Sequence, residues 1–392
     1  MSTPARAGNV PQHPVRLGVV GCDRHARDLA AQHPWEYPFV GRHAVITACA
    51  PLASANRELE ALARRTGARL MGSWRELLAA SDVDAVLLLV PPPRRPELVR
   101  AAIEAGCAVL CPAPLAPDAH QLRALAQAIA DAQAVVVTAG VLAHTPAGRN
   151  ALEVLASGTV GRIESAFAAV RWHAHDAHAG SAHAGLPDAA WDVLDFVLEA
   201  LDAPVSRVYA HAARLFESGN PHDTVVSIMR FASGTVFSFE AAACLPPVLT
   251  IPDAGEIELE LIGAHEALRI EPFQTAVSVA LTSAQEGVPL TSTPAGVALT
   301  SAQEGVPLTS AQEGVPLTSA PGEVPMPGAQ ARIERRDWID PPIAGMLGAL
   351  LAAMHEPSRA HDGIARQQRL CALADAMRAS IDSAQPVEVI AA

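Results

Sequence analysis

Three aspartates in the middle of the chain have the spacing of a single helix face. Asp188, Asp192 and Asp195 are separated by four and then three residues, and residues at this spacing lie on one side of an α-helix. Such carboxylates, facing a cleft, can bind a polyol or a cation, and one with a raised pKa can act as a general acid or base. Alternatively, Asp188 caps the helix after Pro187 and Asp195 makes structural hydrogen bonds. The sequence leaves both interpretations open.

A histidine-rich segment precedes these aspartates. Its members are His173, His175, Asp176, His178 and His183. If a strand continues into this segment, His173 and His175 face the same side, and with one aspartate of the following helix they form a plausible metal site. The segment is otherwise mostly Ala, Gly and Ser, which favours exposed histidines in a loop, and we predict no metal. His183 remains a candidate acid or base beside Asp188 and Asp192.

A third group of residues resembles a phosphate-binding turn. Its candidate cofactor-binding residues are Gly18, Gly21, Cys22, Asp23 and Ala26. A dinucleotide-binding turn has the pattern G-x-G-x-x-G/A directly after a strand, and Gly21 and Ala26 fit its first and third positions. Asp23 occupies the second position, where glycine normally lets the backbone approach a pyrophosphate. Its carboxylate would oppose an anion there, so the pattern predicts a turn with weakened cofactor binding.

The end of the next strand carries no acid. Ala44–Cys49 reads as a strand and is followed by Ala50, at the place where an acid commonly holds the ribose hydroxyls of NAD. Without this acid, discrimination against the 2′-phosphate of NADP is weakened, and the sequence does not select between NAD and NADP as the cofactor. Cys111 ends a later strand and is interpreted as an apolar filler, because no activating base lies near it in the sequence.

The elements that position these residues alternate in the first part of the chain. Short apolar segments typical of buried parallel strands alternate with segments of helical periodicity. The strands are predicted at 15–20, 44–49, 84–90, 108–111 and 134–138, and the helices at 53–65, 96–105 and 118–132. Ser73 and Glu76 form a candidate capping box that opens a further helix. This alternation predicts a parallel sheet whose ligands bind beyond the carboxyl ends of the strands.

The second part of the chain has a different pattern. Helices are predicted at 151–157 and 188–201. Strands are predicted at 163–171, 205–215, 224–231, 235–241, 256–262, 267–270, 331–335 and 387–390. Ser233 and Gly234 separate two of these strands as a hairpin turn. Two further helices are predicted within 341–383. The sequence therefore predicts an α+β domain on an open, largely antiparallel sheet.

A nonapeptide repeat interrupts this second part. Five copies begin at Leu281, Leu290, Leu299, Leu308 and Leu317. The repeat has no aromatic and no basic residue and lacks the aspartate ladder of calcium-binding nonapeptides. We interpret residues 281–325 as a flexible loop insertion, and residues 1–14 as a flexible N-terminus without the apolar segment of a signal peptide.

Composition excludes several classes of function. The net charge is −13, and all 28 basic residues counted as Lys or Arg are arginines. Lysine chemistry is therefore absent, and an acidic chain with scattered arginines is a poor nucleic-acid binder. No apolar segment approaches the roughly 18 residues of a membrane span. The six cysteines lie mostly in apolar segments without paired spacing, which predicts buried thiols in a cytoplasmic protein.

Several segments together resemble the glucose–fructose oxidoreductase / inositol dehydrogenase (Gfo/Idh/MocA) family. They are RLGVVGC at 16–22, SDVDAVLLLVPPP at 81–93, AAIEAGCAVLCPAPLA at 101–116, LASGTVGRIES at 155–165, PDAAWDVLDFVLEALD at 187–202 and the tail 364–386. The resemblance implies a Rossmann-type, doubly wound domain over 15–140 and an α+β domain over 141–392. It also implies a nicotinamide cofactor, a sugar-like or cyclitol-like ligand and a homo-oligomer formed through the open sheet. Pro91 and Pro114, which follow two strands, are candidate cofactor contacts.

The sequence departs from the family pattern at the residues expected to do chemistry. Ala113 stands where the family has a lysine, and Asp192 stands where it has a histidine. The first hypothesis is therefore a family member that has lost standard hydride transfer and binds a nucleotide or small polar ligand. Losing a general acid or base typically costs roughly 10²–10⁴ in rate, which supports this first hypothesis. The alternative is an active NAD(P)-dependent oxidoreductase that uses Asp192, Asp188 or His183 as a relocated acid or base.

Overall fold

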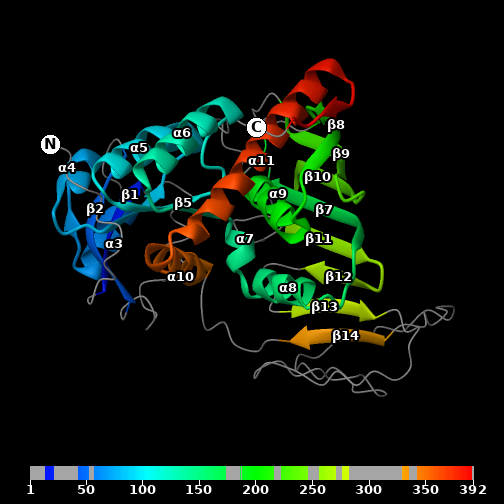
Figure 1. Ribbon diagram of the computed structural model, residues 1–392, viewed down its shortest axis with the longest axis horizontal. Coiled ribbons are helices and arrows are strands. Elements are labelled where there is room, and N and C mark those ends of the chain that lie inside the picture. The colour runs from blue at the N-terminus through cyan, green and yellow to red at the C-terminus, as the bar shows by residue number, and fades with distance from the viewer. Residues whose placement is uncertain are drawn as a thin grey trace.

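Two sheets form the framework of the protein. The computed structural model describes residues 14–21, 43–52, 57–173, 186, 188–215, 222–245, 256–270, 276–281, 329–334 and 342–390. One sheet has six strands in the order β3-β2-β1-β4-β5-β6, and the other has nine in the order β14-β13-β12-β11-β7-β10-β9-β8-β15. Figure 1 shows them in separate halves of the molecule, with helix α11 running from one half to the other.

The six-stranded sheet is parallel throughout. Its strands are β1 (Val15–Gly21), β2 (Ala44–Ala50), β3 (Arg69–Leu70), β4 (Ala85–Leu89), β5 (Ala108–Pro112) and β6 (Val136–Ala139). The central strand β4 is buried along its whole length because helices cover both faces of the sheet. The strand order reverses between β1 and β4, and this switch point is where ligands bind in open parallel sheets.

Helices cover both faces of this sheet. They are α3 (Arg57–Thr66), α4 (Trp74–Ala79), the 3₁₀ turn η2 (Pro92–Arg94), α5 (Arg95–Glu104), α6 (Ala119–Ala132) and α10 (Pro342–His355). Side chains of α3 and α10 enter the core on one face, and those of α4, α5 and α6 enter the core on the other. The predicted cap of α4 is confirmed, because Ser73 Oγ accepts a hydrogen bond from the Glu76 amide at 3.3 Å. The doubly wound prediction is thus confirmed.

The nine-stranded sheet is antiparallel except for the parallel pair β10 and β7. Its strands are β7 (Ile163–His173), β8 (Val205–Ala213), β9 (Thr224–Phe231), β10 (Val236–Leu245), β11 (Glu256–Gly263), β12 (Glu266–Ile270), β13 (Ala276–Leu281), β14 (Ala329–Glu334) and β15 (Val387–Glu388). The predicted mixed, largely antiparallel sheet is confirmed. Strand β13 was not predicted, and the nonapeptide repeat lies outside the described residues beyond its first residue, Leu281.

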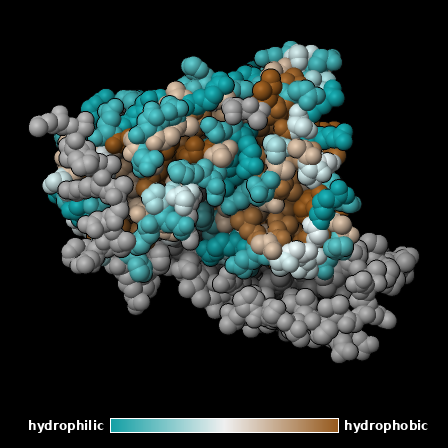
Figure 2. Space-filling view, viewed as in Figure 1, coloured by the Kyte–Doolittle hydropathy of each residue, from teal (hydrophilic) through white to brown (hydrophobic). Residues whose placement is uncertain are grey.

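One face of the nine-stranded sheet is covered by helices, whereas no helix among the described residues covers the other. Helix α9 (Asp188–Leu201) packs against β7, and α11 (Ser358–Ser383) packs against β8. Strand β9 shows the alternation expected of a half-covered sheet, since Met229 is buried whereas Ile228 is 54% exposed. In Figure 2 hydrophilic residues dominate the outer helices α5 and α6, and hydrophobic residues reach the surface beside β7 and β11.

Helix α11 belongs to the cores of both halves. Its Ile364 and Cys371 pack into a core of the six-stranded sheet, whereas its Leu370 and Met377 pack into the core of the nine-stranded sheet. The short helices α7 (Val141–His144) and α8 (Pro146–Ala156) follow β6 and lead into the second half. This arrangement places the carboxyl ends of β5 and β6 next to α9 and α11.

Candidate active site

The first strand ends in a turn that requires glycine. Gly21 has a φ of +90°, and a Cβ there would overlap the backbone carbonyl of Leu89 at the end of β4. Gly18 lies inside β1, and its missing Cβ leaves room for Leu77 of α4, whose Cδ2 would lie 2.6 Å away. A contact of Gly18 with a cofactor therefore stays a prediction. The other predicted residues of this turn, Cys22, Asp23 and Ala26, lie outside the described residues.

The end of β2 is apolar. Cys49 and Ala50 are fully buried, so the strand end that commonly carries an acid for the ribose is occupied by small side chains. Nothing in these two residues provides a charge that would select between NAD and NADP.

The loops after β4 and β5 meet around a buried arginine. Arg95, the first residue of α5, is only 2% exposed. Its Nε donates to the carbonyl of Val90 at 2.9 Å, and its Nη1 donates to the carbonyls of Pro112, at 3.1 Å, and Pro114. Pro91 follows Val90 and precedes η2. The guanidinium therefore ties the end of β4 to the end of β5.

Ala113 directly follows β5 and lies between Pro112 and Pro114, whose carbonyls Arg95 binds. The Ala113–Pro114 peptide bond is cis, and both residues are buried. The preceding Cys111 is completely buried, and burial raises the pKa of its thiol to about 11, while the charge of Arg95 acts in the opposite direction. The interpretation of Cys111 as an apolar filler agrees with this protonated, buried state.

Asp192 lies where β6 passes into α7. Its Oδ2 accepts a hydrogen bond from the Leu142 amide at 2.8 Å, in the first turn of α7, where backbone amides favour a carboxylate. Asp192 can lie this close to the backbone because residue 140 is glycine, where a Cβ would overlap Asp192 Oδ1. Asp192 is partly exposed. The structure thus places this predicted residue at the carboxyl edge of the six-stranded sheet.

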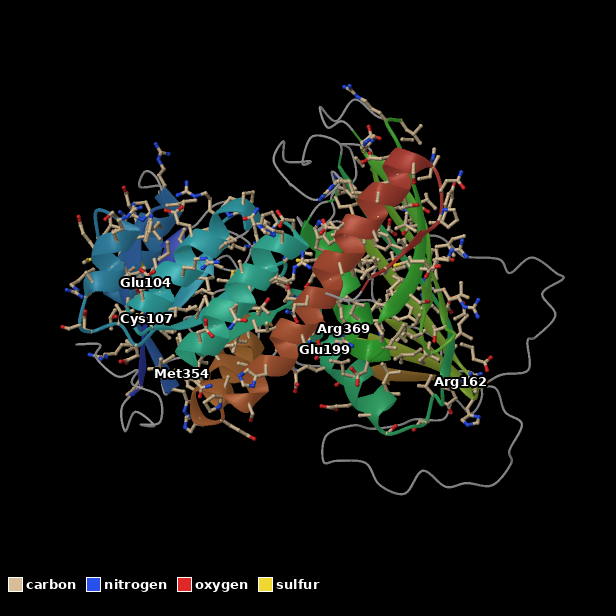
Figure 3. The ribbon with its side chains drawn as sticks, turned by 45° about the horizontal axis from the view of Figure 1, so that its top comes forward. Glu104, Cys107, Arg162, Glu199, Met354 and Arg369 are labelled. Carbon is tan, nitrogen blue, oxygen red and sulfur yellow. The ribbon has the colours of Figure 1, made fainter. Side chains whose placement is uncertain are left out.

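Asp195, on the same helix face, is a structural residue. It is fully buried, and its Oδ1 accepts hydrogen bonds from Arg366 Nε at 3.0 Å and from Gln367 Nε2 at 2.8 Å. Burial raises the pKa of this carboxyl, opposed by the charge and hydrogen bond of Arg366. Arg366 also lies 3.4 Å from Glu199 Oε2. Figure 3 shows Glu199 of α9 next to Arg369 of α11, between the two halves.

Gln367 connects this cluster to the loop after β5. Its Oε1 accepts a hydrogen bond from the Leu115 amide at 3.0 Å, while its Nε2 binds Asp195. The side chain is fully buried and uses both ends of its amide. One residue of α11 thereby sets the distance between the loop that contains Ala113 and the helix that carries Asp192.

His144 is a titratable residue that sequence reasoning missed. It ends α7 and lies against α10, where a Cβ at Gly345 would be 2.9 Å from its Nδ1. Burial lowers its pKa to about 4, reinforced by the positive charges of Arg149 and Arg366. The imidazole is therefore neutral at pH 7.

The remaining predicted residues are only partly described. Helix α9 begins at Asp188, but the structure describes only the backbone of that residue, and His183 lies outside the described part of the chain. Among the described residues no three potential metal ligands lie together, and most of the histidine-rich segment is not among them. None of the cysteines that the structure describes forms a disulfide, and Cys49, Cys107, Cys111 and Cys371 are buried. None of the described helices is long and apolar enough to span a bilayer.

A doubly wound parallel sheet with a glycine turn at its switch point defines a dinucleotide-binding type of α/β protein. Residues 15–140 match the family described as "Oxidoreductase family, NAD-binding Rossmann fold", and residues 149–269 match the "GFO/IDH/MocA C-terminal domain". Together these matches cover more than half of the chain. The chain therefore belongs to the Gfo/Idh/MocA oxidoreductase family, and it carries that family's NAD-binding domain.

Relatives of this chain include a levoglucosan dehydrogenase and an inositol dehydrogenase. Levoglucosan dehydrogenase of Pseudarthrobacter phenanthrenivorans is 29% identical over 226 residues, 48% of this chain and 57% of that protein. Inositol 2-dehydrogenase 3 of Saccharopolyspora erythraea is 33% identical over 148 residues, 38% of this chain and 42% of that protein. The matches span about half the length of these relatives.

Solved structures share the whole fold. An oxidoreductase domain protein from Kribbella flavida superimposes with a TM-score of 0.72 at 18% identity, covering 97% of this chain and 100% of the other. A levoglucosan dehydrogenase in complex with NADH and levoglucosan gives a TM-score of 0.70 at 20% identity, covering 96% and 99%. At these identities the likeness establishes the fold.

Proposed function

We propose that the protein is an NAD(H)-dependent oxidoreductase that interconverts a hydroxyl and a carbonyl group on a sugar-like or cyclitol-like substrate. The observation that carries this proposal is the position of Asp192 at the carboxyl ends of the parallel strands, where its carboxylate is held by the Leu142 amide. Membership of the family and the dehydrogenase names of its relatives support it. They favour the active alternative over the hypothesis of lost catalysis.

The described residues fit a dinucleotide. The turn at Gly21 follows β1 directly at the switch point, and the small side chains at the end of β2 leave the adenosine side without an opposing charge. When bound, the cofactor supplies a nicotinamide ring that accepts or returns a hydride. Asp23, in the turn that follows Gly21, remains the residue predicted to weaken this binding.

In this proposal Asp192 handles the proton. During oxidation the substrate carbon gives up its hydrogen as a hydride, and the hydroxyl proton passes to the Asp192 carboxylate as the C=O bond forms. The hydrogen bond from Leu142 orients the carboxylate, and Gly140 allows it to lie against the backbone. Asp188, one helical turn earlier on the same face, and His183 stay candidates for the same role.

A non-catalytic binding protein is the second candidate. It is favoured by Ala113, a buried methyl group at the position where the family resemblance implies a lysine, in a chain that has no lysine at all. Such a protein would keep the interdomain site for a nucleotide or a small polar ligand without turnover.

The test compares Asp192 of helix α9 with Asp202, the residue directly after that helix. The full chain and the variants Asp192→Asn and Asp202→Asn are incubated with NAD⁺ and a panel of polyols that includes inositols and levoglucosan, and NADH formation is followed by absorbance. The Asp202 side chain is 91% exposed, which makes it a matched control. We expect turnover in the parent chain, a loss of roughly 10²–10⁴ in Asp192→Asn and no change in the control. Turnover that survives in Asp192→Asn would show that another residue is the base. Binding of the cofactor without turnover of any polyol would favour the second candidate.

We also propose that the open face of the nine-stranded sheet joins copies of this chain. Tyr209 and Ile228 are cross-strand partners on β8 and β9 and are 39% and 54% exposed, and Val226 beside them is 48% exposed. A cluster of large apolar side chains on an uncovered sheet is typical of an interface.

A further inference from the structure

Arg95 carries a positive charge in an unusual place. It is 2% exposed, yet its hydrogen-bond partners are backbone carbonyls of Val90, Pro112 and Pro114. Within the described ranges no carboxylate lies within 4.0 Å of it, whereas the neighbouring Arg94 pairs with Glu97 at 2.9 Å. A buried charge without a counter-ion is costly, and such groups concentrate at functional sites.

The position of the guanidinium relates it to Ala113. The carbonyls of Pro112 and Pro114 flank that residue on either side, and Arg95 Nη1 binds both. A positive charge is therefore fixed directly beside the backbone of Ala113, although the side chain at that position is a methyl group. The charge of Arg95 also acts on Cys111 near the end of β5, where it lowers the thiol pKa that burial raises.

The topology indicates which part of a dinucleotide lies here. The acid that normally binds the adenosine ribose follows the second strand, so the adenosine half lies over β1 and β2. The nicotinamide half then extends across the switch point to the ends of β4, β5 and β6. Arg95 ties the first two of these three strand ends together, and Asp192 lies at the third.

We infer that Arg95 supplies the fixed positive charge of the hydride-transfer site, in place of the lysine that this chain lacks at Ala113. This inference rests on the proposed function. The electric field of the Arg95 guanidinium disfavours the positively charged ring of NAD⁺ relative to the neutral ring of NADH. The same field stabilises negative charge that develops on the substrate oxygen. The role is electrostatic, because the guanidinium is held by backbone carbonyls and does not have to leave them.

The ratio of the NAD⁺ and NADH dissociation constants reports the effect of the Arg95 charge, and its measurement requires no turnover. Two unit charges about 12 Å apart in a medium of effective dielectric constant about 20 change an equilibrium constant roughly tenfold. We expect the full chain to bind NADH more tightly than NAD⁺. We further expect Arg95→Met to reduce the ratio of the NAD⁺ to the NADH dissociation constant by about tenfold, and Arg95→Lys to retain most of the ratio.

Calorimetric titration with NAD⁺, NADH and ADP-ribose tests this, with Arg94→Met as the matched control. Arg94 is 46% exposed and already paired, so its removal should leave the ratio unchanged. A folded Arg95→Met variant with an unchanged ratio would reduce Arg95 to a structural role. If Arg95→Met does not fold, the parent chain still decides, because NAD⁺ binding more tightly than both NADH and ADP-ribose would overturn the inference. Failure of the parent chain to bind any of the three ligands would instead refute the proposed function, and this inference with it.

Discussion

Gly140→Ala tests whether Asp192 is held in the way the site requires. Gly140 has a φ of −70°, a value that alanine adopts without strain, so the effect of the substitution comes from its methyl group. The added Cβ would overlap Asp192 Oδ1 and lie 3.1 Å from Asp195 Oδ2. Asp192 must then move and lose the 2.8 Å hydrogen bond from Leu142.

The expected magnitude follows from two opposing contributions. Losing a hydrogen bond to a charged group lowers the free energy of unfolding by about 1.5–3 kcal/mol. Replacing glycine by alanine raises it by about 0.4–1 kcal/mol, because alanine reduces the conformational entropy of the unfolded chain. The free energy of unfolding should therefore fall by about 1–2 kcal/mol, measured by urea denaturation. If Asp192 is the base, turnover should fall as well.

Gly363→Ala is the matched control. Gly363 lies inside α11, and a Cβ there would be 3.5 Å from the Thr138 carbonyl, an ordinary contact. Alanine in a helix interior is favoured over glycine by about 0.5–1 kcal/mol, so this variant should be more stable than the parent chain. A Gly140→Ala variant as stable as Gly363→Ala would refute the placement of Asp192.

Three further predictions concern titration, the buried ion pair and assembly. The pKa of His144 is about 4 in the folded chain and 6.5 when unperturbed, so the unfolded chain takes up a proton on this residue first as the pH falls. The free energy of unfolding should therefore fall by roughly 2–3 kcal/mol between pH 7 and pH 4. Urea denaturation should show a smaller fall in His144→Gln. Arg366→Met leaves Asp195 buried without its cation and should cost about 3 kcal/mol at pH 8. The loss should be smaller at pH 5 if protonation of Asp195, whose pKa is raised, relieves it, and an equal loss at both values would contradict this. Ile228→Glu on the open sheet face should lower the mass seen by light scattering, whereas an unchanged mass would remove that face from the interface.

The sequence predicted the framework well because its signals are local. Apolar segments and helical periodicity depend on neighbouring residues, so β4 and α9 appear within one or two residues of their predicted limits. Strand β3 has only two residues, too few for a periodic signal, and the last residue of β13, Leu281, is also the first residue of the predicted repeat. The spacing of the aspartates also correctly placed Asp192 and Asp195 on one helix.

The site depends on contacts between distant residues, which spacing cannot reveal. The hydrogen bond from the Leu115 amide to Gln367 joins residues 252 positions apart, and that from Arg366 to Asp195 spans 171 positions. Arg95 could have been noticed as a charge near two apolar strand ends, but its carbonyl partners follow from the fold alone. The same holds for His144, which lies against α10, a helix far away in the sequence.

The central claim is that this chain binds a nicotinamide cofactor for hydride transfer, and titration of the purified, ligand-free full chain with NADH and NADPH tests it most directly. We predict binding of at least one cofactor with a dissociation constant in the micromolar range, which would also show that Asp23 is tolerated in the turn after Gly21. No binding of either cofactor up to millimolar concentration would contradict the proposed oxidoreductase and direct attention to other ligands of the site between α9 and the parallel sheet.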